Sequence, residues 1–251
     1  MSNTKKVLVV TGGSRGIGAA TALLAAEQGY DIAIAFRRRE AEAEAVAETI
    51  RRQGGRCIAV RGDVSQERDV LRLFAAVDED LGTVTALVNN AGILETQQRV
   101  EKMSLERLQR VFATNIIGPF LCAREAVQRM STRHGGGGGA IVNVSSAAAR
   151  LGSPGEYVDY AASKGAVDTF TVGLAQEVAA EGIRVNAVRP GFIQTEIHAD
   201  GGEPNRIDRV KGGIPLRRGG QPEEVARAIL WLLSEEASYS TGAFIDVAGG
   251  R

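Results

Sequence analysis

The chain has only two cysteines, no net charge and no long apolar run. Cys57 and Cys122 lie far apart in segments expected to be buried, so they form neither a disulfide framework nor a metal-ligand cluster. Thirty basic and thirty acidic side chains cancel, and no overall field favours nucleic acid or an anionic membrane. No segment has membrane-spanning length, and the N-terminal MSNTKK lacks a secretory pattern. We expect a cytoplasmic protein that binds neither nucleic acid nor membranes.

Apolar runs alternate with amphipathic segments, as in a parallel sheet covered by helices on both faces. The expected strands are 7–10, 31–36, 56–61, 85–88, 140–144, 183–188 and 243–247. The expected helices are 19–28, 40–53, 66–81, a long one beginning at Ser104, 156–180 and 222–233. There is no repeat and no internal linker. The sequence of 251 residues therefore predicts one α/β domain over 1–251, a Rossmann fold with a doubly wound, parallel, seven-stranded sheet.

A glycine-rich turn, Thr11-Gly-Gly-Ser-Arg-Gly-Ile-Gly18, joins the first strand to the first helix. Glycines let the backbone approach a pyrophosphate, and amides at a helix N-terminus face its negative charge. The spacing is G-x-x-x-G-x-G rather than G-x-G-x-x-G, and the turn alone would be weak support for a nucleotide. With a strand before it and a helix behind it, the turn favours a dinucleotide. The expected contacts are Gly12, Ser14, Arg15, Gly16, Ile17 and Gly18.

The end of the second strand indicates which cofactor is bound. An acidic residue there would bind the ribose 2′-hydroxyl and repel a 2′-phosphate. This chain instead has Phe36-Arg37-Arg38-Arg39, with Arg15 in the glycine turn. Guanidinium groups match a phosphate dianion in charge and geometry. The arginines therefore predict NADP(H) rather than NAD(H), bound by Arg37 and Arg38, although they could also be the solvated start of a helix.

Other chemistry-bearing residues follow later strands or lie in later helices. Asp63 could accept a hydrogen bond from adenine or serve as a turn residue. Asn115 lies in an apolar helix, where an amide needs a partner, so it is either a core residue or part of a site. A four-residue spacing puts Tyr160 and Lys164 on one helix face, where the cation would lower the phenol's pKa. Taken alone, this pair is more typical of a helix surface.

Four motifs in this order resemble those of the short-chain dehydrogenase/reductase family, from Lys5 to the C-terminus. They are the glycine turn (T-G-x-x-x-G-x-G), Asn89-Asn90-Ala91-Gly92 (N-N-A-G), Tyr160-x-x-x-Lys164 (Y-x-x-x-K) and Pro190-Gly191. The resemblance implies that Pro190-Gly191 receives the nicotinamide. The remaining cofactor contacts that it implies are Asp63, Val64, Asn90, Ala91, Gly92, Tyr160, Lys164, Ile193 and Thr195.

The resemblance also implies the catalytic roles. Tyr160 is the general acid that protonates a carbonyl oxygen, and Lys164 lowers its pKa and holds the ribose hydroxyls. Ser146 orients the substrate oxygen; it is preferred to Ser145 because the family's serine lies six residues before a glycine, here Gly152. Asn115 positions a water that links Lys164 to bulk solvent. Family members commonly form tetramers, and a homotetramer is expected here.

These expectations combine into an NADPH-dependent oxidoreductase that acts on the carbonyl or secondary alcohol of a small molecule, with a substrate lid around 193–218. One alternative is a 3-oxoacyl-carrier-protein reductase, which needs two basic residues to dock its acidic carrier. Arg133 could be one of them, but Glu181 occupies the other position. A second alternative is a non-catalytic NADPH-binding scaffold, although such proteins typically lose the catalytic residues. A sugar-nucleotide epimerase would need a second domain.

Overall fold

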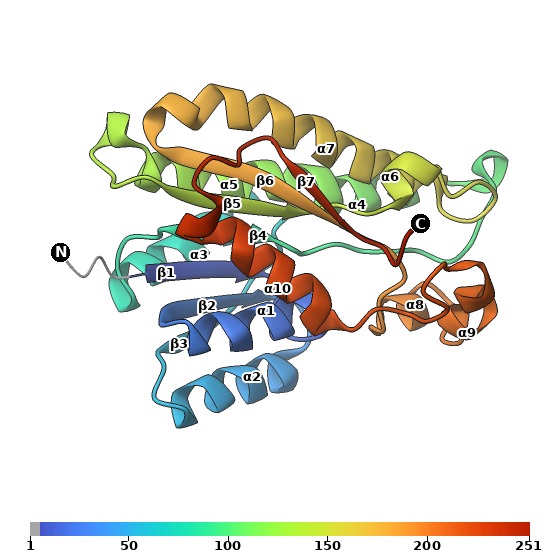
Figure 1. The fold of residues 1–251 in the computed structure, drawn as a ribbon, viewed down its shortest axis with the longest axis horizontal. Coiled ribbons are helices and arrows are strands. Elements are labelled where there is room, and N and C mark those ends of the chain that lie inside the picture. Colours follow the sequence, from blue (N-terminus) through green and yellow to red (C-terminus); the bar gives the residue numbers. More distant parts are fainter. Residues whose placement is uncertain (1–5) are drawn as a thin grey trace.

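A parallel sheet lies between two layers of helices in the computed structural model, which describes residues 6–251 (Figure 1). Lys5, where the resemblance begins, lies outside the described residues. Within that range the strands are β1 (Lys6–Thr11), β2 (Tyr30–Phe36), β3 (Cys57–Arg61), β4 (Ala86–Asn89), β5 (Gly139–Val144), β6 (Ile183–Pro190) and β7 (Phe244–Val247). Their order is β3-β2-β1-β4-β5-β6-β7, and neighbouring strands pair in parallel. The predicted doubly wound sheet is confirmed, and its order reverses between β1 and β4.

Each face of the sheet carries its own apolar core, because successive strand residues point to opposite faces. In β1, Leu8 and Val10 pack into one core, whereas Val7 and Val9 pack into the other. Helices α1 (Gly16–Glu27), α2 (Glu40–Arg52) and α10 (Pro222–Leu233) cover the first face. Helices α3 (Glu67–Asp80), α5 (Gly118–Met130) and α7 (Val158–Val178) cover the second.

The long helix predicted from Ser104 is interrupted. Ser104 does cap α4 (Leu105–Phe112), since its hydroxyl accepts from the amide of Arg107 at 3.3 Å. A π-helical turn, Ala113–Ile117, then separates α4 from α5. Pro119 explains the break, because a proline ring in a continuous α-helix would clash with the carbonyl four residues earlier and remove one hydrogen bond. The apolar pattern continues through the break, so periodicity did not reveal it.

The lid region and the helix before it also differ in detail from the expectation. The helix predicted over 156–180 begins at Val158 and ends at Val178, with a 3₁₀ turn at Ala179–Glu181. A single-turn helix, α6 (Ala148–Leu151), precedes it. Residues 193–218 contain two short helices, α8 (Ile197–Asp200) and α9 (Arg206–Val210). Among residues 6–251, no helix is long and apolar enough to cross a bilayer.

Candidate active site

A cavity of about 930 Å³ opens at the carboxyl ends of the strands, where the strand order reverses. Every residue predicted from the sequence to bind cofactor or act in catalysis lines this cavity, except Gly18 and Asn115. The arginines of the glycine turn and of the β2 end lie at one part of it, and Ser146, Tyr160 and Lys164 at another. One cavity therefore contains the residues expected to bind a dinucleotide and those expected to act on a carbonyl.

The glycine turn is shaped by close contacts with the segment after β4. Gly12 and Gly16 have φ angles of 65° and 55°, which favour glycine. A Cβ on Gly18 would lie 2.4 Å from the carbonyl oxygen of Gly12, so Gly18 allows close packing and does not line the cavity. The Asn90 amide donates to the carbonyls of Thr11 and Gly12 at 2.9 and 3.0 Å. Asn90 thus fixes the turn through its side chain.

The arginines at the end of β2 lie beside carboxylates. Arg37 donates to Asp63 at 3.2 Å. Burial acts to raise the pKa of Asp63, but hydrogen bonds from Ser65 and the charge of Arg37 lower it overall. Asp63 therefore stays ionised, and its contacts with Ser65 form the turn that the sequence left open as one interpretation. Arg38 lies exposed at the cavity edge.

The two serines after β5 have different partners. Ser145 is buried, and its hydroxyl donates to the carbonyl of Lys164 at 3.2 Å. Ser146 accepts from the amide of Ala148 at 3.1 Å, and it acts to lower the pKa of the Tyr160 phenol. Ser145 thus ties β5 to α7, whereas Ser146 lies with the phenol. This arrangement supports the choice of Ser146.

The pKa values of Tyr160 and Lys164 are both set mainly by burial. Burial raises the pKa of Tyr160, against smaller lowering effects of Ser146 and of the Arg206 guanidinium from the lid. Burial lowers the pKa of Lys164 to about 8, opposed by Asp168. The Lys164 ammonium donates to the carbonyl of Val144 at 2.8 Å and lies 5.6 Å from the Tyr160 ring centre. Burial thus raises the pKa of Tyr160 overall, in contrast to the lowering expected from Lys164.

The depressed pKa of Lys164 gives a prediction about stability. The unfolded chain holds this proton up to about pH 10.5 and the folded protein only up to about 8, so folding gains stability as pH rises between these values. Relative to Lys164→Met, the wild-type protein should gain about 3 kcal/mol over this range. Urea unfolding at several pH values measures the difference. Lys211→Met, at an exposed lid position, should show no such trend, and a pH-independent difference for Lys164→Met would contradict the prediction.

Asn115 is fully buried in the π-helical turn and hydrogen-bonds residues of two other segments. Its Oδ1 accepts from the amide of Ile93 at 2.8 Å, and its Nδ2 donates to the Ile93 carbonyl at 3.0 Å and to Ser163 Oγ at 3.1 Å. Ser163 in turn donates to the carbonyl of Tyr160 at 2.6 Å. The side-chain amide is thus committed to protein groups. The water-positioning role stays a prediction.

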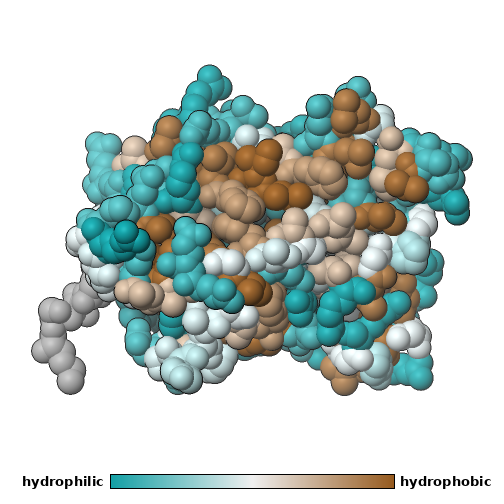
Figure 2. Space-filling model, turned by 90° about the horizontal axis from the view of Figure 1, so that it is seen from above, coloured by the Kyte–Doolittle hydropathy of each residue, from teal (hydrophilic) through white to brown (hydrophobic). Residues whose placement is uncertain are grey.

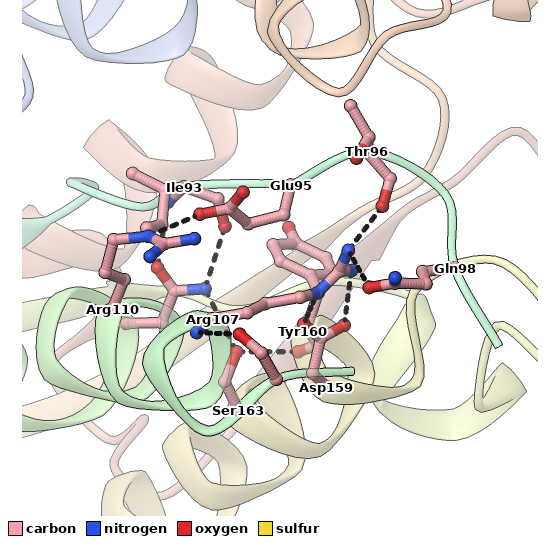
Figure 3. A network of polar contacts seen from close by, with 11 residues as sticks. Ile93, Glu95, Thr96, Gln98, Arg107, Arg110, Asp159, Tyr160 and Ser163 are labelled. Atoms are coloured by element: carbon pink, nitrogen blue, oxygen red, sulfur yellow. Dashed lines mark hydrogen bonds and ion pairs between the residues drawn. The ribbon is translucent and has the colours of Figure 1, made fainter. Parts of the chain in front are cut away.

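A buried ion pair beside Tyr160 was not predicted from the sequence. Arg107 on α4 donates to Asp159 on α7 at 2.7 and 3.2 Å (Figure 3). It also donates to the carbonyl of Thr96 at 2.6 Å and to Gln98 at 3.2 Å. The pair therefore fastens the helix that carries Tyr160 to the segment after β4. Arg107 lies in the polar first turn of an amphipathic helix. The sequence there does not distinguish a buried arginine from an exposed one.

The lid also contributes an arginine that sequence reasoning missed. Arg206 is buried; its guanidinium lies 4.5 Å from the ring centre of Tyr157 and 5.3 Å from that of Phe192, and Nη2 donates to Glu156 at 2.5 Å. It lines the cavity and lowers the pKa of Tyr160. The lid sequence has no regular periodicity, so no pattern indicated Arg206 as a residue of the site.

The sheet order, the glycine turn and the Ser146, Tyr160 and Lys164 cluster are those of a nicotinamide-dependent oxidoreductase. The chain belongs to the short-chain dehydrogenase/reductase family, and the resemblance seen in its motifs is confirmed. A family profile described as "Enoyl-(Acyl carrier protein) reductase" matches residues 12–251.

The chain is similar over nearly its whole length to individual members of the family. It is 60% identical over 245 residues to the Escherichia coli oxidoreductase YgfF, covering 98% of this chain and 99% of that one. It is 37% identical over 247 residues to glucose 1-dehydrogenase 2 of Bacillus subtilis, covering 98% and 95%. A crystal structure of a short-chain type dehydrogenase/reductase from Mycobacterium marinum superposes with a TM-score of 0.91 at 36% identity, covering 98% and 94%.

Proposed function

We propose that this protein is an NADPH-dependent reductase of a carbonyl group in a small molecule, able to run in reverse on the secondary alcohol. One observation carries the proposal: the cavity holds arginines at the ribose end and Ser146, Tyr160 and Lys164 at the other. Arg15 Nη1 is buried without a hydrogen-bond partner, which fits a guanidinium that receives a phosphate oxygen. The residues thus fit the cofactor, which supplies or accepts the hydride when bound.

In the proposed mechanism, the Tyr160 hydroxyl donates its proton to the carbonyl oxygen as negative charge develops there. Because burial raises the pKa of Tyr160, the phenol is protonated at neutral pH, as the reduction direction requires. Ser146, which lines the same cavity, holds the carbonyl oxygen in line with the phenol. Lys164, with a pKa of about 8, can exchange a proton near neutral pH and so reprotonate the phenolate.

The experiment that tests this function compares NADPH with NADH oxidation against a panel of carbonyl compounds. The panel contains acyl thioesters, α-dicarbonyls, quinones and keto-sugars. Turnover of any of them with NADPH supports the reductase, whereas tight NADPH binding without turnover of any would favour the scaffold alternative. The lid, residues 193–218, is proposed to select among substrates, because Ile193, His198 and Arg206 line the cavity.

The acyl-carrier alternative is ranked lower because of the contacts of Arg133. Its guanidinium donates to Glu181 at 3.0 Å, and Glu181 also accepts from Ser131 at 2.5 Å. Hydrogen bonds from Ser131 and Arg133 lower the pKa of Glu181, so it is ionised and offsets the cation that an acidic carrier would need. The acyl-thioester arm of the panel, repeated with the thioester on a carrier protein, decides between the two.

The 2′-phosphate contacts are tested by Arg37→Gln/Arg38→Gln. Loss of two guanidinium contacts to a dianion should weaken NADPH binding by at least about tenfold. NADH carries no phosphate at this position and should bind nearly unchanged. Fluorescence titration of both cofactors measures the effect, with Arg52→Gln on the exposed side of α2 as the control. Equal losses for NADPH and NADH would refute the assignment.

We further propose a homotetramer, since two separate surfaces expose large apolar side chains. One includes Phe120 on α5, which stacks on Phe170 of α7 at 3.9 Å between ring centres. Figure 2 shows apolar residues gathered on one face of the molecule. The other includes Trp231 and Tyr239, on and after α10. Light scattering measures whether the mass in solution is four times the 26.5 kDa of one chain.

A further inference from the structure

The lid is tied to the glycine turn by an ion pair across the mouth of the cavity. Asp200, the last residue of α8, accepts from Nη2 of Arg15, although the two residues are 185 positions apart in the chain. Its other carboxylate oxygen lies 3.9 Å from Nη2 of Arg39. All three residues line the cavity, at the end that contains Arg37 and Arg38. The acidic side chain of Asp200 in the lid thus lies where the 2′-phosphate is expected.

Arg15 has more donors than Asp200 can satisfy. Its Nη1 is buried and has no hydrogen-bond partner, while its side chain as a whole is 28% exposed. A buried donor without an acceptor costs free energy, and a phosphate offers three oxygens to a planar guanidinium. A carboxylate that contacts only Nη2 is therefore a partial substitute for a phosphate.

We propose that Asp200 is a specificity-determining residue that competes with the 2′-phosphate of NADPH for Arg15. This inference rests on the proposed NADPH specificity. Two anions cannot lie against one guanidinium without repelling each other, and the phosphate carries the larger charge. NADPH therefore displaces Asp200, whereas NADH leaves the pair intact. Asp200 is the last residue of α8, which also carries the cavity-lining His198. NADPH therefore separates this end of the lid from Arg15, whereas NADH does not.

The test is the binding of nucleotide fragments to Asp200→Asn, which keeps the size of the side chain and removes its charge. Calorimetry with 2′,5′-ADP and 5′-AMP isolates the phosphate from contacts made by the nicotinamide. We expect 2′,5′-ADP and NADPH to bind about fivefold tighter to the variant, the effect of removing one partly exposed charge interaction, and 5′-AMP and NADH to change little. Asp208→Asn is the matched control, because Asp208 lies in the same lid and pairs with Lys211 at 2.8 Å, outside the cavity.

A double-mutant cycle shows whether the effect acts through Arg15. In an Arg15→Gln background, Asp200→Asn should no longer change the affinity for 2′,5′-ADP. If the wild-type protein prefers NADPH to NADH but Asp200→Asn binds 2′,5′-ADP no more tightly than the wild type, Asp200 does not compete with the 2′-phosphate. The proposed function is then unaffected. A wild-type protein that binds 2′,5′-ADP no better than 5′-AMP overturns the NADPH specificity itself, and the inference with it.

Discussion

Replacing Tyr160 with phenylalanine is expected to remove most of the turnover while NADPH binding stays nearly unchanged. The substitution removes only the phenol oxygen, the one proton donor that we place at the substrate carbonyl. General acid catalysis contributes about a hundredfold to ten-thousandfold, so kcat should fall by about a thousandfold. The cofactor contacts proposed for the glycine turn and the arginines are untouched. Steady-state kinetics with a substrate found in the panel, together with fluorescence titration of NADPH, measures both quantities.

Tyr157 provides a matched control for this substitution. It lies three residues earlier and also lines the cavity, but it is buried and its hydroxyl donates to the carbonyl of Gly201 at 3.4 Å. Loss of so long a hydrogen bond costs about 1 kcal/mol or less, so Tyr157→Phe should keep most of the turnover. If Tyr160→Phe retained wild-type kcat, or if both variants lost it equally, Tyr160 would not be the general acid.

Arg107→Met is expected to lower the free energy of unfolding by about 3–5 kcal/mol, the range for breaking a buried ion pair. The side chains of Arg107 and Asp159 are only 6% and 1% exposed. Without the guanidinium, the Asp159 carboxylate would be buried with no cation, and the carbonyl of Thr96 would lose its donor. Urea unfolding measures the loss. Because Asp159 precedes Tyr160, kcat should fall as well.

Arg110, on the same helix as Arg107, is the control because its ion pair is exposed. It pairs with Glu95 at 3.0 Å, and its side chain is 56% exposed, so Arg110→Met should cost less than about 1 kcal/mol. Arg107→Met/Asp159→Leu removes both buried charges and should recover part of the stability lost by Arg107→Met alone. Equal losses for Arg107→Met and Arg110→Met would contradict the account of the buried pair.

The sheet was predictable because parallel strands buried on both faces are continuous apolar runs. Val7 to Val10 form such a run, and helices such as α3 bury residues at i, i+3, i+4 and i+7. The glycine turn and the Tyr160 and Lys164 pair were predictable because their chemistry depends on residues close together in the chain. The carboxyl ends of neighbouring parallel strands then bring these motifs to one edge.

What the sequence did not reveal depends on residues far apart. Arg107 and Asp159 are 52 positions apart, and nothing in either segment indicates that the other is its partner. The same holds for Arg15 and Asp200 across the cavity mouth. The raised pKa of Tyr160 has a related cause: helical spacing places Lys164 near the phenol, but burial by the surrounding chain is the largest effect on that pKa.

The π-helical turn, Ala113–Ile117, acts as a one-residue insertion between α4 and α5. Each residue of an α-helix turns the chain by about 100°. One extra residue between α4 and α5 therefore rotates the buried face of α5 by about 100° relative to that of α4. Arg107 can then face Asp159 while Cys122 and Ala126 pack against the sheet. Deleting one residue from this turn would rotate Arg107 away from its partner. The length of this turn therefore determines whether Arg107 reaches Asp159.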